Sequence, residues 1–116
     1  MDKDCEYAYA APGATALETA LGALVELVAV ERLSLTVAVR ALTSGPAETF
    51  GLDAGRLAVG GPADVVVFDP LATWTVEPAR FYSRGQSTPL AGRHLRGRVR
   101  TTLVGGAVVF DANAEY

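Results

Sequence analysis

The chain has 116 residues, half of them apolar, which suits one small domain with a core of moderate size. Its net charge of −3 gives no general attraction to nucleic acid or to a membrane surface. Cys5 is the only cysteine, so no internal disulfide forms, and a reducing cytoplasm is the expected location. The N-terminus lacks the apolar run of a signal peptide, and the most hydrophobic window, 21–30, is far shorter than the ~20 residues of a membrane span.

The first predicted element is a helix that begins at about Ala16. Pro12-Gly13 forces a turn before it, and the Thr15 side chain can accept hydrogen bonds from the first free N–H groups. Glu18 stands three residues after Thr15 and can reach back to it, so the two residues have the spacing of a capping box. The apolar residues that follow recur at helical spacing and predict one buried face, made of Leu17, Leu21, Leu24, Val25 and Val28.

A second helix is predicted after Ser34, whose hydroxyl suits an N-cap. Gly45 is expected to end this helix, and Pro46 to open a short third turn that ends near Gly51. Residues 1–51 are thus predicted to be loop and helices. The second helix has an apolar stripe of its own, formed by Leu35, Val39 and Leu42.

After Gly60-Gly61-Pro62 the pattern becomes that of strands. Residues 63–68 form a continuous apolar run rich in β-branched side chains, which predicts a strand covered on both faces. Residues 74–76 are a shorter strand candidate, and 78–95 are expected to be mostly loop.

The last predicted feature is a β-hairpin. Residues 98–104 and 107–110 both have strand character, and Gly105-Gly106 separates them. A two-residue type I′ turn needs positive φ at both positions, which glycine adopts freely, so this spacing is a strong hairpin signal.

Three blocks, considered together, resemble the C-terminal part of bacterial dihydroorotases, which are members of the amidohydrolase superfamily. The first is 9–21, Tyr-Ala-Ala-Pro-Gly-Ala-Thr-Ala-Leu-Glu-Thr-Ala-Leu. The second is 55–69, Gly-Arg-Leu-Ala-Val-Gly-Gly-Pro-Ala-Asp-Val-Val-Val-Phe-Asp. The third is 88–93, Thr-Pro-Leu-Ala-Gly-Arg, which precedes Leu-Arg-Gly-Arg-Val at 95–99. Each block alone is a weak signal, since the Gly-Arg-Leu-x-x-Gly-x-x-Ala-Asp pattern of the second recurs across many amidohydrolases. The combined order and spacing of the three blocks indicate dihydroorotase.

The resemblance implies an architecture that the pattern alone does not give. In dihydroorotases a (β/α)8 barrel carries the active site, and a small composite β-domain is built from strands at both chain ends. By this resemblance 7–16 correspond to the loop after the eighth barrel strand, and 16–30 to the eighth barrel helix. The expected fold is therefore an α+β fragment: 1–51 resemble the end of the barrel, with short helices, and 52–116 resemble the C-terminal part of the sandwich-like β-domain.

The family uses zinc, held by histidines, a carboxylated lysine and an aspartate. Zinc needs three or four such ligands. This chain has one histidine, His94, and one cysteine, Cys5, and neither stands at a family ligand position. The resemblance therefore implies a zinc enzyme in its complete form, with no metal ligand, no catalytic residue and no cofactor in this chain.

Pro12 and Gly13 are the candidate substrate-binding residues. In the family the two backbone positions before the eighth helix touch substrate, and Pro12 and Gly13 align with them. Amides beside a helix N-terminus suit an anionic ligand. The simpler interpretation, a turn that only feeds the helix, is favoured from the chain alone. The family also often has glycine where Ala16 stands, so the loop can sit differently in this chain.

The remaining candidates have weaker support. Cys5 lies 89 positions from the only histidine and is expected to be an ordinary thiol. Three acidic residues stand near the N-terminus: Asp2, Asp4 and Glu6. The further oxygen ligands of a cation site are absent from their surroundings in the sequence, so they predict a solvated acidic end.

Asp64 precedes a predicted strand and is expected to be a structural hydrogen-bond partner, because no second carboxylate stands at a catalytic spacing. Arg93, Arg96, Arg98 and Arg100 form a basic run without interleaved aromatic residues, so a structural loop and strand are favoured over contact with nucleic acid.

Three functional interpretations follow. The first is the C-terminal portion of a dihydroorotase, catalytic only together with its barrel. The second is a non-catalytic dihydroorotase-like subunit or structural partner of aspartate transcarbamoylase. The third is an unrelated small binding module. An eighth helix without its barrel would expose Leu17, Leu21, Leu24 and Val28, so either the helix folds back on the β-domain or another chain covers it. Self-association through this helix is therefore expected.

Overall fold

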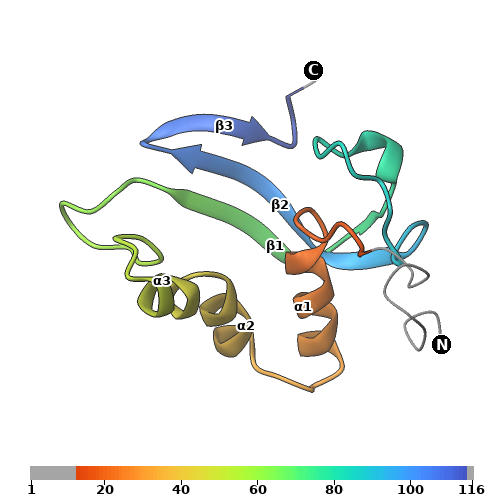
Figure 1. Ribbon diagram of the computed structural model, residues 1–116, viewed down its shortest axis with the longest axis horizontal. Coiled ribbons are helices and arrows are strands. Elements are labelled where there is room, and N and C mark those ends of the chain that lie inside the picture. Colours follow the sequence, from red (N-terminus) through yellow and green to blue (C-terminus); the bar gives the residue numbers. More distant parts are fainter. Residues whose placement is uncertain (1–12, 115–116) are drawn as a thin grey trace.

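The structure is a computed structural model that describes residues 13–114. A three-stranded sheet and a group of helices make up this part of the chain, so the fold is α+β (Figure 1). The elements in chain order are α1 (Ala20–Ala29), α2 (Leu35–Leu42), α3 (Ser44–Phe50), β1 (Val65–Thr75), the 3₁₀ helix η2 (Pro78–Arg80), β2 (His94–Val104) and β3 (Ala107–Asp111).

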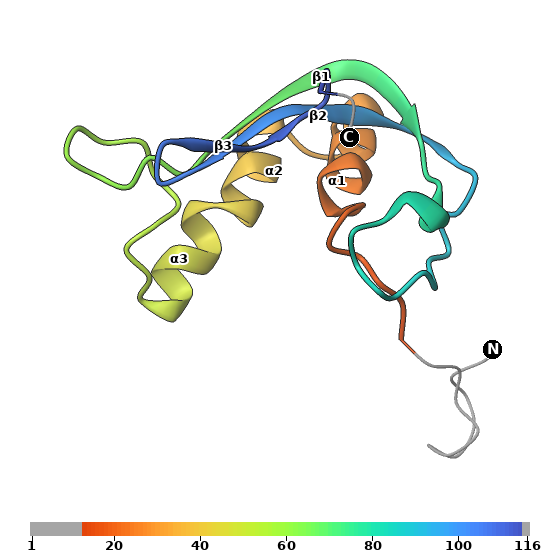
Figure 2. The same cartoon turned by 90° about the horizontal axis from the view of Figure 1, so that it is seen from above.

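The sheet is antiparallel and has the order β1-β2-β3. Figure 2 shows it as an arch, with the three α-helices on its concave side. Within 13–114 no helix has the length and apolar character needed to cross a membrane. Residues 76–93, which link β1 to β2, fold back beside the segment that enters α1 (Figures 1 and 2).

The two separate strands predicted at 63–68 and 74–76 are one strand, β1, with an irregularity between Asp69 and Thr73. The Asp69 carboxylate accepts hydrogen bonds from the Leu71 amide at 2.9 Å and the Ala72 amide at 3.1 Å. It also forms an ion pair with Arg100 at 3.2 Å. The bond from Leu71, followed by those from Arg100 and Ala72, holds the pKa of Asp69 below its ordinary value. These contacts hold the backbone of β1 in place at the irregularity, so that the strand continues beyond it.

The predicted hairpin is confirmed. Gly105 and Gly106, which join β2 to β3, have φ angles of 56° and 80°, as a type I′ turn requires. The Asp64 carboxylate accepts a hydrogen bond from the Gly105 amide at 2.8 Å, and the Gly106 amide donates to the Ala63 carbonyl at 3.0 Å. Asp64 is thus a structural partner of the turn, as expected from its position before β1.

The predicted start of the first helix is wrong. Regular α-helix begins at Ala20, four residues later than expected, and residues 17–19 form a turn. The Thr15–Glu18 capping box is absent: Thr19 is the N-cap residue and makes no side-chain cap bond. The physical reason is a competing interaction, because the Glu18 carboxylate instead binds backbone amides of residues 82 and 83.

The Ser34 cap of α2 is confirmed, since its hydroxyl accepts a hydrogen bond from the Val37 amide at 3.2 Å. The break before α3 comes at Thr43, two residues earlier than the predicted Gly45. The Thr43 hydroxyl donates to the Val39 carbonyl at 2.7 Å, which satisfies an acceptor near the end of α2. The third helix ends at Gly51, in the left-handed conformation, as predicted.

Helix α1 packs on strand β2 through two glycines. A Cβ on Gly22 would lie 3.0 Å from Leu95 Cδ1, and a Cβ on Gly97 would lie 2.8 Å from Val25 Cγ2. The Glu26 carboxylate accepts a hydrogen bond from the backbone amide of Arg96 at 2.8 Å, which fixes the helix along the strand. The helix therefore folds back on the sheet, one of the two arrangements that the sequence allowed.

The predicted apolar face of α1 is only partly buried. Val25 is 3% exposed, whereas Leu17, before the helix, is 87% exposed. Leu21, Leu24 and Val28 are half-buried. The buried apolar side chains among the described residues are few and mostly small: Val25, Ala38, Ala47, Val76 and Leu95.

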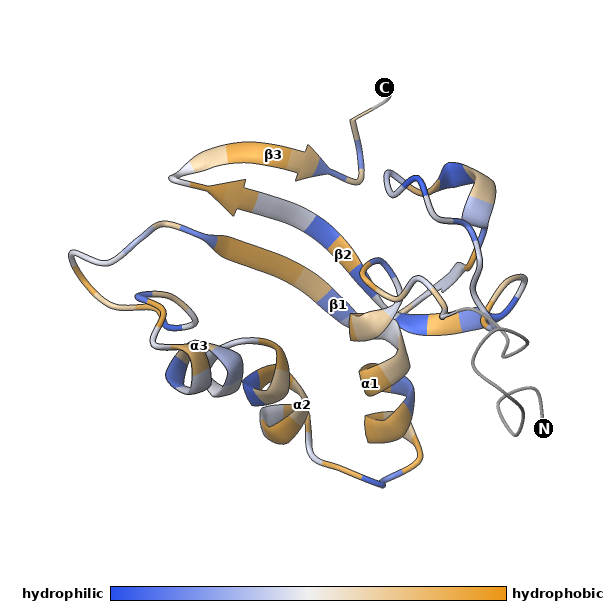
Figure 3. Ribbon diagram, viewed as in Figure 1, coloured by the Kyte–Doolittle hydropathy of each residue, from blue (hydrophilic) through white to orange (hydrophobic). Residues whose placement is uncertain are grey.

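The prediction that the first strand is covered on both faces is wrong for this chain. Val66 and Val67 of β1 are about half exposed, and so are Val108 and Val109 of β3. In Figure 3, which colours the ribbon by hydropathy, apolar residues make up much of β1, β3, α1 and α2. The reason is geometric: α1 covers the part of β2 around Gly97 and leaves the apolar ends of the sheet open.

Candidate functional site

The structure describes one of the two predicted substrate-binding residues. Gly13 is exposed, and a Cβ on it would meet no atom of residues 13–114 within 4 Å. Pro12 lies outside the described residues. The substrate role of this pair stays a prediction.

The backbone that follows Gly13 is held by a turn. The Ala16 carbonyl accepts hydrogen bonds from the amides of Thr19 at 3.1 Å and Ala20 at 2.9 Å. The Thr19 side chain is 2% exposed, and its hydroxyl donates to the same carbonyl at 3.3 Å. Three donors on one carbonyl give residues 16–20 a fixed shape before α1 begins.

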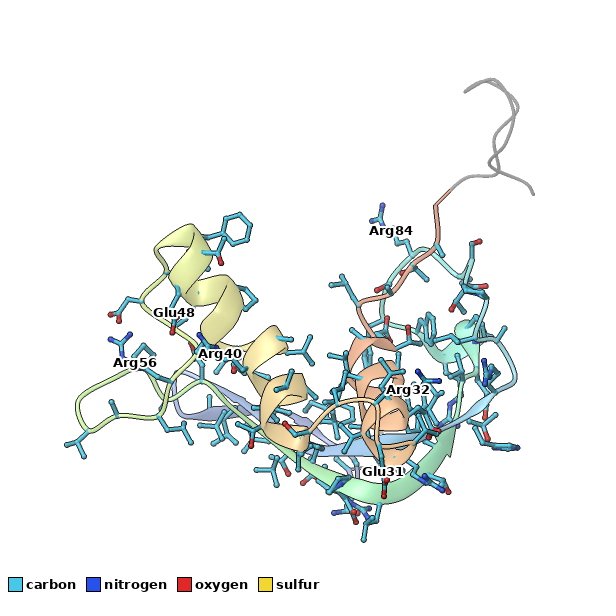
Figure 4. All side chains as sticks on the ribbon, turned by 90° about the horizontal axis from the view of Figure 1, so that it is seen from below. Glu31, Arg32, Arg40, Glu48, Arg56 and Arg84 are labelled. Atoms are coloured by element: carbon cyan, nitrogen blue, oxygen red, sulfur yellow. The ribbon has the colours of Figure 1, made fainter. Side chains whose placement is uncertain are left out.

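A second segment, residues 82–87, lies against this turn. The Thr15 amide donates to the Ser87 carbonyl at 2.8 Å. A Cβ on Gly85 would lie 3.6 Å from Thr15 Cβ, which is ordinary van der Waals contact. Figure 4 shows Arg84, from the same loop, beside the chain that enters α1 and pointing away from the sheet. Residues 13–18 and 82–87 thus form one continuous surface, here called the entry surface.

Glu18 links the two halves of the entry surface. Its carboxylate accepts hydrogen bonds from the Tyr82 amide at 3.1 Å and the Ser83 amide at 2.9 Å. Burial raises the pKa of Glu18, but the bonds from Ser83, amide and hydroxyl, and from the Tyr82 amide outweigh it, so the pKa lies below its ordinary value. Glu18 is therefore ionised at neutral pH.

Sequence reasoning missed this role of Glu18. The spacing from Thr15 matched a capping box, and a local pattern carries no information about a partner 64 or 65 residues away.

The other sequence candidates lie elsewhere or outside the described residues. Cys5 and the acidic residues near the N-terminus belong to the latter group. The His94 Nδ1 atom lies 2.9 Å from the Thr75 hydroxyl, at the paired ends of β1 and β2. In the described part of the chain no three His, Cys, Asp or Glu side chains gather as metal ligands would.

The basic run forms strand β2 from His94 onward and the loop before it, as the structural interpretation predicted. Arg100 is paired with Asp69, and the backbone of Arg96 is bound to Glu26. The Arg93 amide and carbonyl both take part in the loop's hydrogen bonds, with Leu90 and Val76. These contacts give the run a structural role.

Two open depressions lie away from the entry surface. One, of about 450 Å³, is lined by residues 57–65, which lead into β1. The other, of about 480 Å³, lies between α2 and the start of α3. Both are mainly apolar and contain none of the residues of the entry surface, so neither bears on the predicted substrate contact.

Residues 9–110 match the amidohydrolase family, and the chain belongs to that family. Among its relatives are dihydroorotases. The dihydroorotase of Anaeromyxobacter sp. (strain K) is 49% identical over 111 residues, which cover 96% of this chain and 26% of the relative. The dihydroorotase of Syntrophus aciditrophicus (strain SB) is 40% identical over 110 residues, which cover 95% of this chain and 26% of the relative.

A solved structure shows the same fold. The structure of a D-hydantoinase superposes with a TM-score of 0.81 at 30% identity, over 90% of this chain and 23% of that chain. The chain thus spans about a quarter of the length of the relatives that it matches. The resemblance to dihydroorotases predicted from the three sequence blocks is confirmed by these sequence identities.

Proposed function

We propose that this chain is the C-terminal portion of a dihydroorotase-like cyclic amidohydrolase, which in complete form interconverts carbamoyl aspartate and dihydroorotate in pyrimidine biosynthesis. The observation that carries the proposal is identity of 40–49% to dihydroorotases across nearly the whole chain. The 30% identity to a D-hydantoinase structure is lower and supports the broader class of cyclic amide hydrolases.

The exposed apolar surface supports a role as one part of a larger assembly. Leu17 is 87% exposed and Val37 of α2 is 55% exposed, while few large apolar side chains are buried in residues 13–114. Each Å² of apolar surface removed from water contributes roughly 25 cal/mol. Contact with the rest of a barrel would therefore stabilise this chain substantially. We place such an assembly in the cytoplasm.

Zinc, which the family uses, does not fit the residues described. A zinc site needs three or four nitrogen, sulfur or carboxylate ligands at one point. His94 is the one histidine of the sequence and lies beside Thr75 at the end of the sheet, and residues 13–114 hold no cluster of such ligands. The proposal therefore assigns zinc and the catalytic steps to the barrel, and no activity to the chain by itself.

A graft tests the proposal. This chain would replace the matching segment of an active dihydroorotase, and zinc content and turnover of dihydroorotate would be measured. We expect full zinc content, because every ligand lies in the retained barrel, and measurable turnover. Loss of zinc would overturn the proposed placement. Full zinc content without turnover would favour the non-catalytic subunit or partner of aspartate transcarbamoylase.

A second variant of the graft tests the substrate-facing position. Gly13→Val should reduce turnover strongly while zinc content and folding stay intact, since no described atom lies within 4 Å of the new Cβ. Arg98→Ala, in strand β2, is the control and should leave turnover per folded molecule unchanged. Equal turnover of Gly13→Val and the unsubstituted graft would remove Gly13 from the substrate site.

A further inference from the structure

The entry surface is joined at two points that are far apart in the sequence. One is the hydrogen bond from the Thr15 amide to the Ser87 carbonyl at 2.8 Å. The other is the carboxylate of Glu18, which accepts from the amides of Tyr82 and Ser83. Neither contact belongs to a helix or a sheet ladder, so regular secondary structure does not account for them.

The geometry at Glu18 is that of a clamp. One carboxylate oxygen accepts from the Tyr82 amide at 3.1 Å, and the other accepts from the adjacent Ser83 amide at 2.9 Å. Hydrogen bonds to an ionised acceptor are roughly twice as strong as those between neutral groups. Two successive amides bound to two oxygens of one side chain also fix the orientation of the loop.

The clamp is connected to the backbone near Gly13 by a turn that hydrogen bonds hold in place. Glu18 lies within the turn closed on the Ala16 carbonyl, and the neighbouring Thr19 side chain is 2% exposed. The turn transmits the position of the loop to Thr15, which the Ser87 carbonyl holds directly. Loosening Glu18 would therefore release both ends of the entry surface.

We propose that Glu18 is a positioning residue of the substrate site: it holds residues 82–87 against residues 13–16 and so fixes the backbone that meets substrate. This inference rests on the proposed function. It differs from a helix-capping role, because the partners of the carboxylate lie in the loop between β1 and β2 and the N-terminus of α1 has no side-chain cap.

Amide hydrogen exchange on the 116-residue chain tests the clamp. Glu18→Gln keeps the size of the side chain and removes its charge, so exchange at Tyr82 and Ser83 should become about tenfold faster. Exchange at Thr15 should accelerate with it. Glu48→Gln is the matched control, because within residues 13–114 the one ion pair of the Glu48 carboxylate is with the exposed Arg40, at 3.5 Å. Faster exchange at Tyr82 and Ser83 with no change at Thr15 would overturn the coupling between the two segments.

Kinetics of the graft test the positioning role. KM for dihydroorotate should rise in the order unsubstituted, Glu18→Gln, Glu18→Ala, at equal zinc content and equal folded fraction. A residue that serves only stability would lower the folded fraction and leave KM and kcat of the folded enzyme unchanged. An active graft whose KM and kcat do not respond to Glu18→Ala would contradict the positioning role of Glu18 and leave the proposed function standing. A graft that is inactive with Glu18 in place would sink the proposed function, and this inference with it.

Discussion

At the scale of single residues, Glu18 is the clearest case in which a charge organises the chain. Its carboxylate is bound by amides of the loop between β1 and β2, and its pKa is lowered despite the opposing effect of burial. Ionised Glu18 is the form that the folded chain prefers. The contact therefore strengthens the fold above the ordinary glutamate pKa and weakens in acid.

The first prediction follows from the sign of this shift. The contribution of Glu18 should be fully present above the unfolded pKa of about 4.3, and it should be lost as the pH falls through the lower pKa of the folded state. In an NMR titration, the amide shifts of Tyr82 and Ser83 should move together with a midpoint below the ordinary pKa of a glutamate side chain. Glu18→Gln should abolish this step. A midpoint at or above the ordinary value would contradict the hydrogen bonds assigned to the carboxylate.

At the scale of elements, the sequence predicted correctly those features that neighbouring residues determine. The Gly105-Gly106 hairpin and the Ser34 cap are confirmed because each depends on two or three adjacent residues. The predictions of where α1 begins and of two separate strands in place of β1 were wrong, because each feature depends on a partner that is remote in the sequence. Glu18 binds residues 82 and 83, and Asp69 binds Arg100, 31 residues later in the chain.

The candidate site shows the same division. Gly13 could be proposed from the resemblance of 9–21 to dihydroorotases, and its substrate contact stays a prediction. The loop at 82–87 could not be placed beside it, because its sequence has no pattern that specifies a docking partner. Tertiary hydrogen bonds to backbone amides leave no periodic trace in a sequence.

The second prediction concerns the contact between α1 and β2. Gly97→Ala should destabilise the chain for two reasons: its φ of 85° disfavours a side chain, and the new Cβ would lie 2.8 Å from Val25 Cγ2. Gly92→Ala is the matched control, since Gly92 has a φ of 76° and open space around it. The control should cost about 1 to 2 kcal/mol from strain alone, and Gly97→Ala about 1 to 3 kcal/mol more.

Urea unfolding would measure both variants against the unsubstituted chain. If Gly97→Ala and Gly92→Ala lost equal free energy of unfolding, crowding between the new Cβ and Val25 would add nothing to the cost of Gly97→Ala. Val25→Ala combined with Gly97→Ala should recover part of the crowding cost, because it removes the methyl groups that the new Cβ meets.

At the scale of the whole molecule, the helices leave an apolar surface that the sheet does not cover. Val25 of α1 is buried against Gly97, and the rest of the predicted apolar face of this helix is half-buried. Leu17 remains exposed, and α2 adds Leu35, Val37 and Leu42, each more than a third exposed. Without a barrel, a second chain that covered this helical surface would remove its apolar side chains from water.

The third prediction is that the isolated chain self-associates through this helical surface. Light scattering should give a mass above that of one chain, rising with concentration. Leu35→Ser combined with Leu42→Ser should shift the mass toward the monomer. Leu71→Ser is the control: Leu71 is 82% exposed but lies in the irregular part of β1. It should leave the mass unchanged.

The pattern of masses also separates the two ways of covering the helices. If the barrel of a dihydroorotase is the true neighbour, adding such a barrel without its own matching segment should dissolve the self-associated form into a mixed complex. That exchange follows because one apolar surface cannot contact two partners at once. If the chain stays monomeric and stably folded at high concentration, the exposure of Leu17, Leu35 and Leu42 does not require a partner. That result would contradict the predicted self-association.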